Sequence, residues 1–244
     1  QNNTRVMFIA RVLIIKEKYL LDPKFMKRMK NLFKNKDFLL ILIYLLSLPI
    51  FGLLNRPIGI VRNFYSPVDD VIPYVPQFIL IYHSWFPFLM ANAYALYKTQ
   101  RIEYRKYMMH LIVGQFAAYL TFIVFQTDVP RAIHLGDSVF DKLVALTYHV
   151  DNHYAGFPSV HALTTMVLIM TVLRSKFKPG YKVFSVFYSV MILASILLVK
   201  QHVFWDLPSG IVYGVITFPL AMVILKRVFP DYLTYDNGQV LTKN

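Results

Sequence analysis

Six long apolar stretches without an Asp, Glu, Lys or Arg recur along this chain of 244 residues. Crossing a bilayer core takes about 20 apolar residues, and aromatic residues at the interface extend a shorter stretch. The pattern therefore predicts an all-α integral membrane protein with six transmembrane helices. They are expected at residues 38–54, 71–97, 107–125, 158–173, 183–199 and 207–225.

The composition supports a membrane protein. Hydrophobic residues make up 57% of the chain and charged residues 16%, whereas a soluble domain has about 45–50% and about 25%. Cysteine is absent, which excludes a disulfide scaffold. The second apolar stretch contains Pro73, Pro76 and Pro87, so we expect an irregular start and a kink in that helix.

The segment before the first apolar stretch is strongly basic, with ten Lys and Arg among residues 1–36. Asp22 and Pro23 have the pattern of a helix cap followed by a first-turn proline. The apolar residues that follow lie on one helical face, which predicts a basic amphipathic helix on an anionic membrane surface. We therefore expect three parts: an interfacial segment (1–37), a six-span membrane domain (38–226) and a cytoplasmic tail (227–244).

Lysine and arginine are distributed unevenly between the two predicted membrane sides. If residues 1–36 are cytoplasmic, that side holds 21 of these residues and the other side holds five. The positive-inside rule then predicts that both termini are cytoplasmic and that loops 55–70, 126–157 and 200–206 face outward. We expect a multi-pass protein of the plasma membrane. Because topology accounts for the net charge of +13, nucleic acid is not an expected partner.

Ionisable residues gather in these outer loops and at their junctions with the helices. The histidines there are His134, His149, His153, His161 and His202, and the acids are Asp69, Asp70, Asp128, Asp137, Asp141, Asp151 and Asp206. Ionisable groups at the ends of spans are costly unless they are paired. Their concentration on one side predicts a functional site.

Two segments carry the strongest signals. In the first, Pro158 opens a helix, Ser159 adds a hydroxyl, and His161 follows two residues later. A helix N-terminus offers unpaired amides to a phosphate, although a well-capped helix has the same appearance. In the second, His202 and Asp206 are one helical turn apart, so the carboxylate can fix one ring nitrogen and leave the other as base or nucleophile. Such a pair is also common in purely structural roles.

Two cations lie near these segments in the predicted topology. Lys200 precedes His202 by two residues, where its charge would neutralise an anionic substrate. Arg131 belongs to the longest outer loop, and its guanidinium would fork onto phosphate oxygens. A solvated arginine, or one bound to lipid headgroups, is the alternative for Arg131.

Together these segments resemble the type-2 phosphatidic acid phosphatase superfamily of membrane enzymes. Its pattern is Lys-x6-Arg-Pro, then Pro-Ser-Gly-His, then Ser-Arg-x5-His-x3-Asp. The matching residues here are Arg131, Pro158, Ser159, His161, Ser195, His202 and Asp206. Val124, Ala132, Val160 and Ile196 depart from the pattern, so two of its cations are missing. The segments 69–76 and 200–202 resemble the branch that contains inositol phosphorylceramide synthases.

The resemblance implies a metal-independent phosphatase acting on a lipid phosphate or diphosphate. His202 would attack phosphorus and form a phosphohistidine, Asp206 would stabilise the imidazolium, and His161 would serve as acid and then base. Arg131, Ser159 and Lys200 would hold the phosphate oxygens. In the inositol phosphorylceramide synthase-like alternative, the phosphate-bearing headgroup passes to an alcohol acceptor instead of water.

Two other functions remain as alternatives. His149 and His153 are spaced i, i+4 with Asp151 between them, a plausible start for a zinc site. No third ligand is indicated, so we expect no metal or cofactor, and expect these three residues to line the substrate entrance or bind a headgroup. A non-enzymatic lipid carrier would favour charged or broken helices at mid-membrane, and only His83 and the nearby prolines fit that pattern.

Overall fold

The computed structural model describes residues 35–132 and 135–230, together with Lys27 and residues 30–32, 235–236 and 239–240. The chain divides into two units, Gln1–Ile43 and Tyr44–Asn244. The predicted basic helix of residues 1–37 lies largely outside the described residues, as does most of the predicted tail 227–244. The second unit contains all the contacts discussed below.

The protein is mostly helical, and each predicted apolar stretch overlaps one of six helices in the described part of the chain. These helices are α3 (Lys36–Leu54), α5 (Ile79–Thr99), α6 (Arg101–Val124), α8 (Val160–Arg174), α9 (Pro179–Leu198) and α10 (Asp206–Val228). Within the described part of the chain, α3, α6, α9 and α10 are long and apolar enough to cross a membrane. Helix α8 is apolar but has 15 residues.

The second apolar stretch begins irregularly, as its prolines predict. A short helix, α4 (Pro67–Val71), and a 3-10 turn, η2 (Pro76–Phe78), precede α5. Pro87 lies inside α5.

The segment 126–157 contains more structure than the outer loop expected from the sequence. Strand β2 (Gln126–Asp128) pairs in parallel with β1 (Val61–Asn63). Helix α7 (Val139–Val150) follows, and Ser138 and Asp141 form a capping box at its start. The Asp141 amide donates to Ser138 Oγ at 3.2 Å. Beyond α10, two-residue strands β3 (Tyr235–Asp236) and β4 (Gln239–Val240) pair antiparallel.

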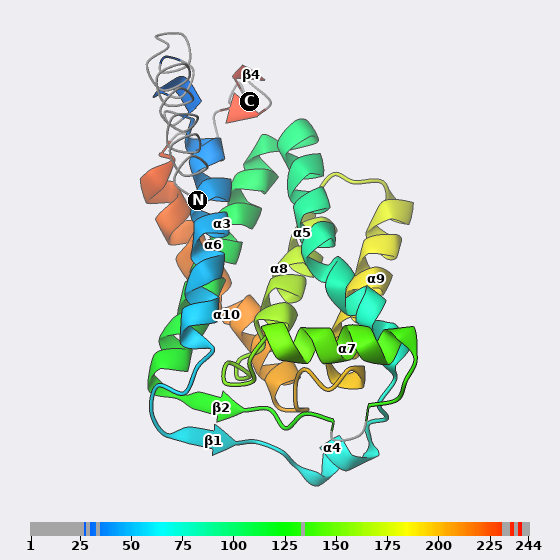
Figure 1. Ribbon diagram of the computed structural model, residues 1–244. Coiled ribbons are helices and arrows are strands. Elements are labelled where there is room, and N and C mark those ends of the chain that lie inside the picture. The colour runs from blue at the N-terminus through cyan, green and yellow to red at the C-terminus, as the bar shows by residue number, and fades with distance from the viewer. Residues whose placement is uncertain are drawn as a thin grey trace, which may run out of the picture. The chain divides into compact units, whose positions relative to one another are not determined.

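Helix α10 packs along both α6 and α8, and α8 also packs against α9. The segments α4, β1, β2 and α7 lie at one end of this bundle, at the bottom of Figure 1, together with the start of α10. The connections from α5 to α6 and from α8 to α9 lie at the opposite end. The three predicted outer loops are therefore gathered at the same end of the molecule.

Two glycines allow α10 to approach α8 closely at this end. A Cβ atom at Gly210 would lie 2.4 Å from the Ser159 carbonyl oxygen, and one at Gly214 would lie 2.9 Å from the Leu163 carbonyl oxygen. The first turn of α8 is thereby fixed against the first turns of α10.

Candidate active site

His202 is buried in the short connection between α9 and α10, and both of its ring nitrogens have partners. Its Nδ1 lies 3.0 Å from Oδ2 of Asp206, the first residue of α10. Its Nε2 lies 3.0 Å from Oγ of Ser159. Because the carboxylate can only accept, Nδ1 carries the proton and Nε2 presents its lone pair.

The surroundings of Ser159 agree with this tautomer. Ser159 is the N-cap of α8, and its Oγ accepts a hydrogen bond from the Ala162 amide at 3.2 Å. Its hydroxyl proton is therefore available to donate to Nε2 of His202. Asp206 is fully buried, and its Oδ2 also accepts from the Val203 amide at 3.1 Å. Both residues that bond the His202 ring are therefore held by backbone amides.

His161 lies in the first turn of α8, and its ring centroid is 5.7 Å from that of His202. Its ring packs against two aromatic side chains of α5, with centroid distances of 4.2 Å to Trp85 and 4.7 Å to Tyr82. These contacts hold the His161 imidazole beside the His202 ring. A small cavity of about 20 Å³ borders both histidines.

Asn55, just after α3, ties down the loop that passes this cavity. Its Nδ2 donates to Asp151 Oδ1 at 2.8 Å and to the Asn152 carbonyl at 2.7 Å, while its Oδ1 accepts from the Tyr154 amide at 2.8 Å. Asp151 lines the cavity. Burial raises the pKa of its carboxyl above the ordinary value, and the nearby charge of Arg131 acts in the opposite direction.

Arg131 is bonded to residues that border the site. Its Nη1 donates to Gln201 Oε1 at 2.5 Å, and its Nη2 donates to the carbonyls of Asp151 and Asn152 at 2.9 and 3.0 Å. The guanidinium also lies over the Tyr148 ring, 4.6 Å from its centroid. Burial lowers the pKa of Arg131. The arginine thus braces the loop and Gln201, the residue next to His202.

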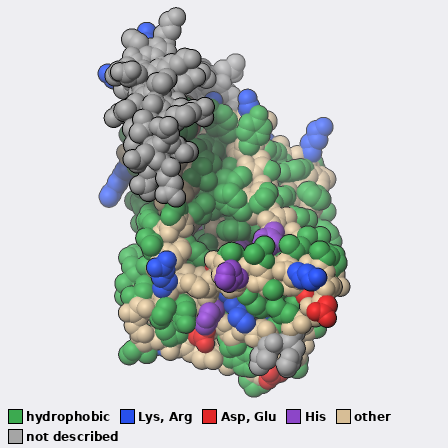
Figure 2. Space-filling view, viewed as in Figure 1, with side chains coloured by type: hydrophobic (Ala, Val, Ile, Leu, Met, Phe, Trp, Pro, Cys, Tyr) green, Lys and Arg blue, Asp and Glu red, His purple; other side chains and the backbone are tan. Residues whose placement is uncertain are grey.

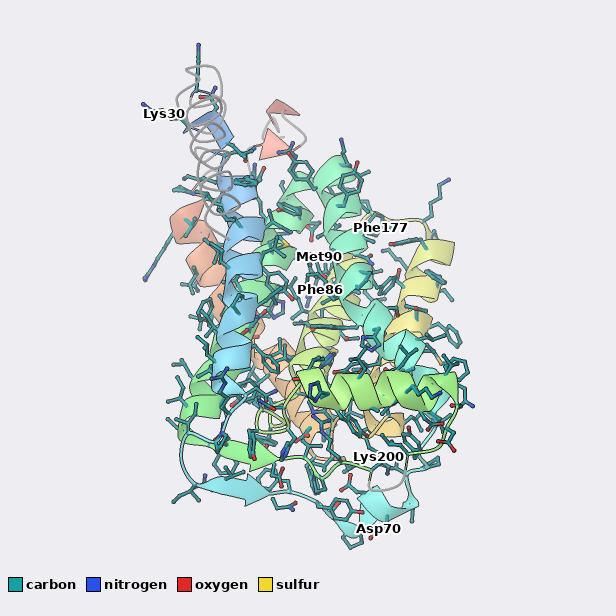
Figure 3. All side chains as sticks on the ribbon, viewed as in Figure 1. Lys30, Asp70, Phe86, Met90, Phe177 and Lys200 are labelled. Atoms are coloured by element: carbon teal, nitrogen blue, oxygen red, sulfur yellow. The ribbon has the colours of Figure 1, made fainter. Side chains whose placement is uncertain are left out.

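Lys200 lies at the lower end of the view in Figure 3, near Asp70. Its backbone has a positive φ of 54°, and its Nζ donates to the carbonyls of Asp69 and Ile72 at 2.9 and 2.6 Å. The Asp69 carboxylate in turn accepts from the Phe204 amide at 2.7 Å. The structure therefore joins Lys200 to the α4 region, and its role in holding phosphate stays a prediction.

Arg131 and Lys200 share a second, outer cavity of about 480 Å³. Its other walls include Asn63, Tyr65 and Tyr74. Arg131 and Lys200 are the cationic residues of its lining.

Two of the three predicted entrance residues border the small cavity, and the third does not. Asp151 and His153 border the small cavity with His202, and His153 also pairs with Asp128. His149 is exposed on α7. Among the described residues, no three His, Asp or Glu side chains are arranged to hold a metal ion.

The sequence alone did not identify four residues of this site: Asn55, Tyr82, Trp85 and Gln201. Gln201 adjoins His202, and Asn55 is a polar residue at the end of a predicted span, which are usable signals. Tyr82 and Trp85 lie in the second apolar stretch, where their aromatic character matched ordinary interfacial anchoring. Only the three-dimensional packing of α5 against α8 assigns them to the site.

Comparison with known proteins gave no match: no family model, no curated protein and no solved structure corresponds to this chain. What the protein does is therefore inferred from its residues and their geometry.

Proposed function

We propose that this chain is a metal-independent membrane lipid phosphatase that acts through a phosphohistidine. The observation that carries the proposal is the His202 ring, with Asp206 on Nδ1 and a lone pair on Nε2 that accepts from the Ser159 hydroxyl. His161 lies beside it, at the N-terminus of an apolar helix. A nucleophile, an orienting acid and a second proton-transfer group are thus together.

The chemistry follows from this arrangement in two steps. In the first, Nε2 of His202 forms a bond to phosphorus as the bond to the lipid oxygen breaks, and His161 gives a proton to that oxygen. In the second, His161 takes a proton from water, whose oxygen attacks phosphorus and breaks the P–N bond. Asp206 stabilises the imidazolium in between. Once Nε2 bonds to phosphorus, the Ser159 hydroxyl would donate to a phosphate oxygen instead, together with amides at the start of α8.

The same proposal places the chain in a membrane with six spans, both termini cytoplasmic and the site on the outer face of the plasma membrane. The uneven distribution of Lys and Arg supports this orientation. The clustering of α4, β1, β2 and α7 at one end of the bundle agrees with it (Figure 1). A place in the type-2 phosphatidic acid phosphatase superfamily is supported by the contact between Ser159 and His202, which lie 43 residues apart.

A second candidate function is transfer of the phosphate-bearing group to an alcohol acceptor. The outer cavity favours it, because about 480 Å³ bordered by Tyr65, Tyr74 and Arg131 has room for a polar acceptor. In that reaction the acceptor hydroxyl replaces water in the second step.

The test is phosphate release from a panel of lipid phosphates in detergent with EDTA. We expect release by the wild type and a loss of at least about 10³-fold in His202→Ala. The control is His110→Ala, which removes a buried histidine of α6 and should retain release if the protein still melts cooperatively. Release that persists in His202→Ala, or that EDTA abolishes and a metal restores, contradicts the proposal. Release only with an added alcohol supports transfer.

A further inference from the structure

A third cavity, the lateral cavity, adjoins the active site at His161. Its volume is about 320 Å³, near the lower end of the roughly 300–1,000 Å³ typical of small-molecule pockets. Five helices supply its walls: Leu48 and Phe51 from α3, Trp85 and Phe86 from α5, Tyr119 from α6, Val150 from α7 and Val160 from α8. Most of the lining is therefore hydrocarbon or aromatic surface.

The polar groups of this cavity include His161 and Asp151, which also border the small cavity on His202. Phe51 and Val160 are likewise shared by the two cavities. His83 and Thr147 also line this cavity, and Nε2 of His83 lies 3.0 Å from Oγ1 of Thr147. A chain attached to a phosphate at His202 would therefore pass His161 and continue into apolar surroundings.

The cavity opens along the flank of the helices. Figure 2 shows a hollow above α7 with mainly hydrophobic walls and with histidine side chains near its lower edge. In Figure 3, Phe86 and Met90 follow one another along α5 on the side of this hollow. Val150, which lines the cavity, is 72% exposed. In the proposed orientation this flank faces the hydrocarbon of the outer leaflet rather than water.

We propose that this cavity binds one hydrocarbon chain of the substrate, inserted laterally from the membrane, and that Leu48 and Phe86 set the room available to it. The inference rests on the proposed function, since it places the phosphate at His202. Because the chain passes from bilayer hydrocarbon into the cavity, van der Waals packing against the cavity walls supplies its contribution to binding. The small volume favours a single chain over two.

The first test measures binding without turnover. The chain has two tryptophans, and Trp85 lines the cavity. The variant Trp205→Phe therefore leaves Trp85 as the single tryptophan, whose fluorescence can be excited selectively. The probe is a single-chain alkyl phosphate brominated along its chain, compared with a brominated alcohol of equal length. We expect the phosphate to quench Trp85 at lower concentration, and an unbrominated alkyl phosphate to reverse the quenching.

Two matched variants locate the chain. Leu48→Phe narrows the cavity, whereas Leu46→Phe makes the same change on α3 at a residue that is 63% exposed and outside the cavity lining. Leu48→Phe should weaken quenching by the phosphate at least tenfold, and Leu46→Phe should leave it unchanged. Equal effects of the two variants, or equal quenching by phosphate and alcohol, would overturn the proposal.

The second test compares substrates. In Leu48→Phe, kcat/KM for a long-chain alkyl phosphate should fall at least tenfold while that for a short soluble phosphate ester is retained. Parallel loss for both substrates contradicts the chain site. Phosphate-dependent quenching with no hydrolysis of either ester would remove the phosphatase and leave the chain site standing. Hydrolysis with no phosphate-dependent quenching would remove the chain site and leave the phosphatase standing.

Discussion

Gly210 of α10 faces the backbone carbonyl of Ser159 so closely that a Cβ atom at position 210 would lie 2.4 Å from that oxygen. Ser159 is also the residue whose hydroxyl bonds His202 at 3.0 Å. The distance between α8 and α10 therefore sets the geometry of the proposed nucleophile.

Gly210→Ala should separate these helices, because real Cβ atoms essentially never lie within 3.0 Å of another heavy atom. We expect at least a tenfold loss of phosphate release and destabilisation of about 1–3 kcal/mol. The control is Gly52→Ala on α3, which meets nothing within 4 Å and should be neutral or stabilising by up to about 1 kcal/mol. Full activity in Gly210→Ala would show that the helix spacing does not govern the site. Thermal melting and the release assay measure both effects.

Asp206→Asn should keep the shape of the pair with His202 while removing the charge that stabilises the imidazolium. We expect kcat to fall by about 10²–10⁴-fold, with KM nearly unchanged, because the group orients the ring rather than binding substrate. Asp70→Asn, an exposed acid of α4, is the control and should retain activity. An Asp206→Asn enzyme with a raised KM and an unchanged kcat would contradict the orienting role.

Lys200→Met separates two roles for this lysine. Its ammonium donates hydrogen bonds to the carbonyls of Asp69 and Ile72. Loss of these hydrogen bonds should destabilise the protein by about 1–2 kcal/mol. If that bracing is its whole role, KM should stay unchanged. A raised KM for all phosphate substrates would support the phosphate-holding role predicted from the sequence. Lys142→Met, at an exposed position of α7, is the matched control for stability.

Asp151→Asn should change how stability depends on pH. Because burial raises the pKa of Asp151 in the folded state above 3.8, the folded protein binds this proton more tightly than the unfolded chain does. Wild-type stability therefore gains a contribution as pH falls through the raised pKa, and this gain is complete below the unfolded value. The neutral variant lacks it, so its stability relative to wild type should be greatest at neutral pH and decline on acidification. Melting curves between neutral and mildly acidic pH test this, and a pH-independent difference would contradict it.

Much of the fold could be read from the sequence because charge-free stretches of near-spanning length have few alternatives to a helix. Helix α7 was not predicted, although Ser138 and Asp141 have the spacing of a capping box. Its signal was obscured because the segment lies among histidines and acids that resembled a polar loop.

The candidate site likewise has a part that the sequence predicts and a part that it does not. Ser159, His202 and Asp206 follow local helix-start and i, i+4 rules, and the structure brings them together. The contacts of Arg131 and Lys200 were not predictable, because their partners are mostly backbone carbonyls distant in sequence, and every residue has a carbonyl. The Trp85 and Tyr82 contacts with His161 likewise depend on how α5 packs.

Under the proposed lateral entry, the hollow on the flank of the helices determines which substrate concentration governs turnover. A substrate that enters laterally is supplied by two-dimensional diffusion, so its rate of capture depends on its mole fraction in the surrounding lipid rather than on its amount per volume of solution. At constant total substrate, adding inert lipid or detergent should therefore slow the enzyme by surface dilution, while a water-soluble ester reaching His202 from the outer end would be unaffected.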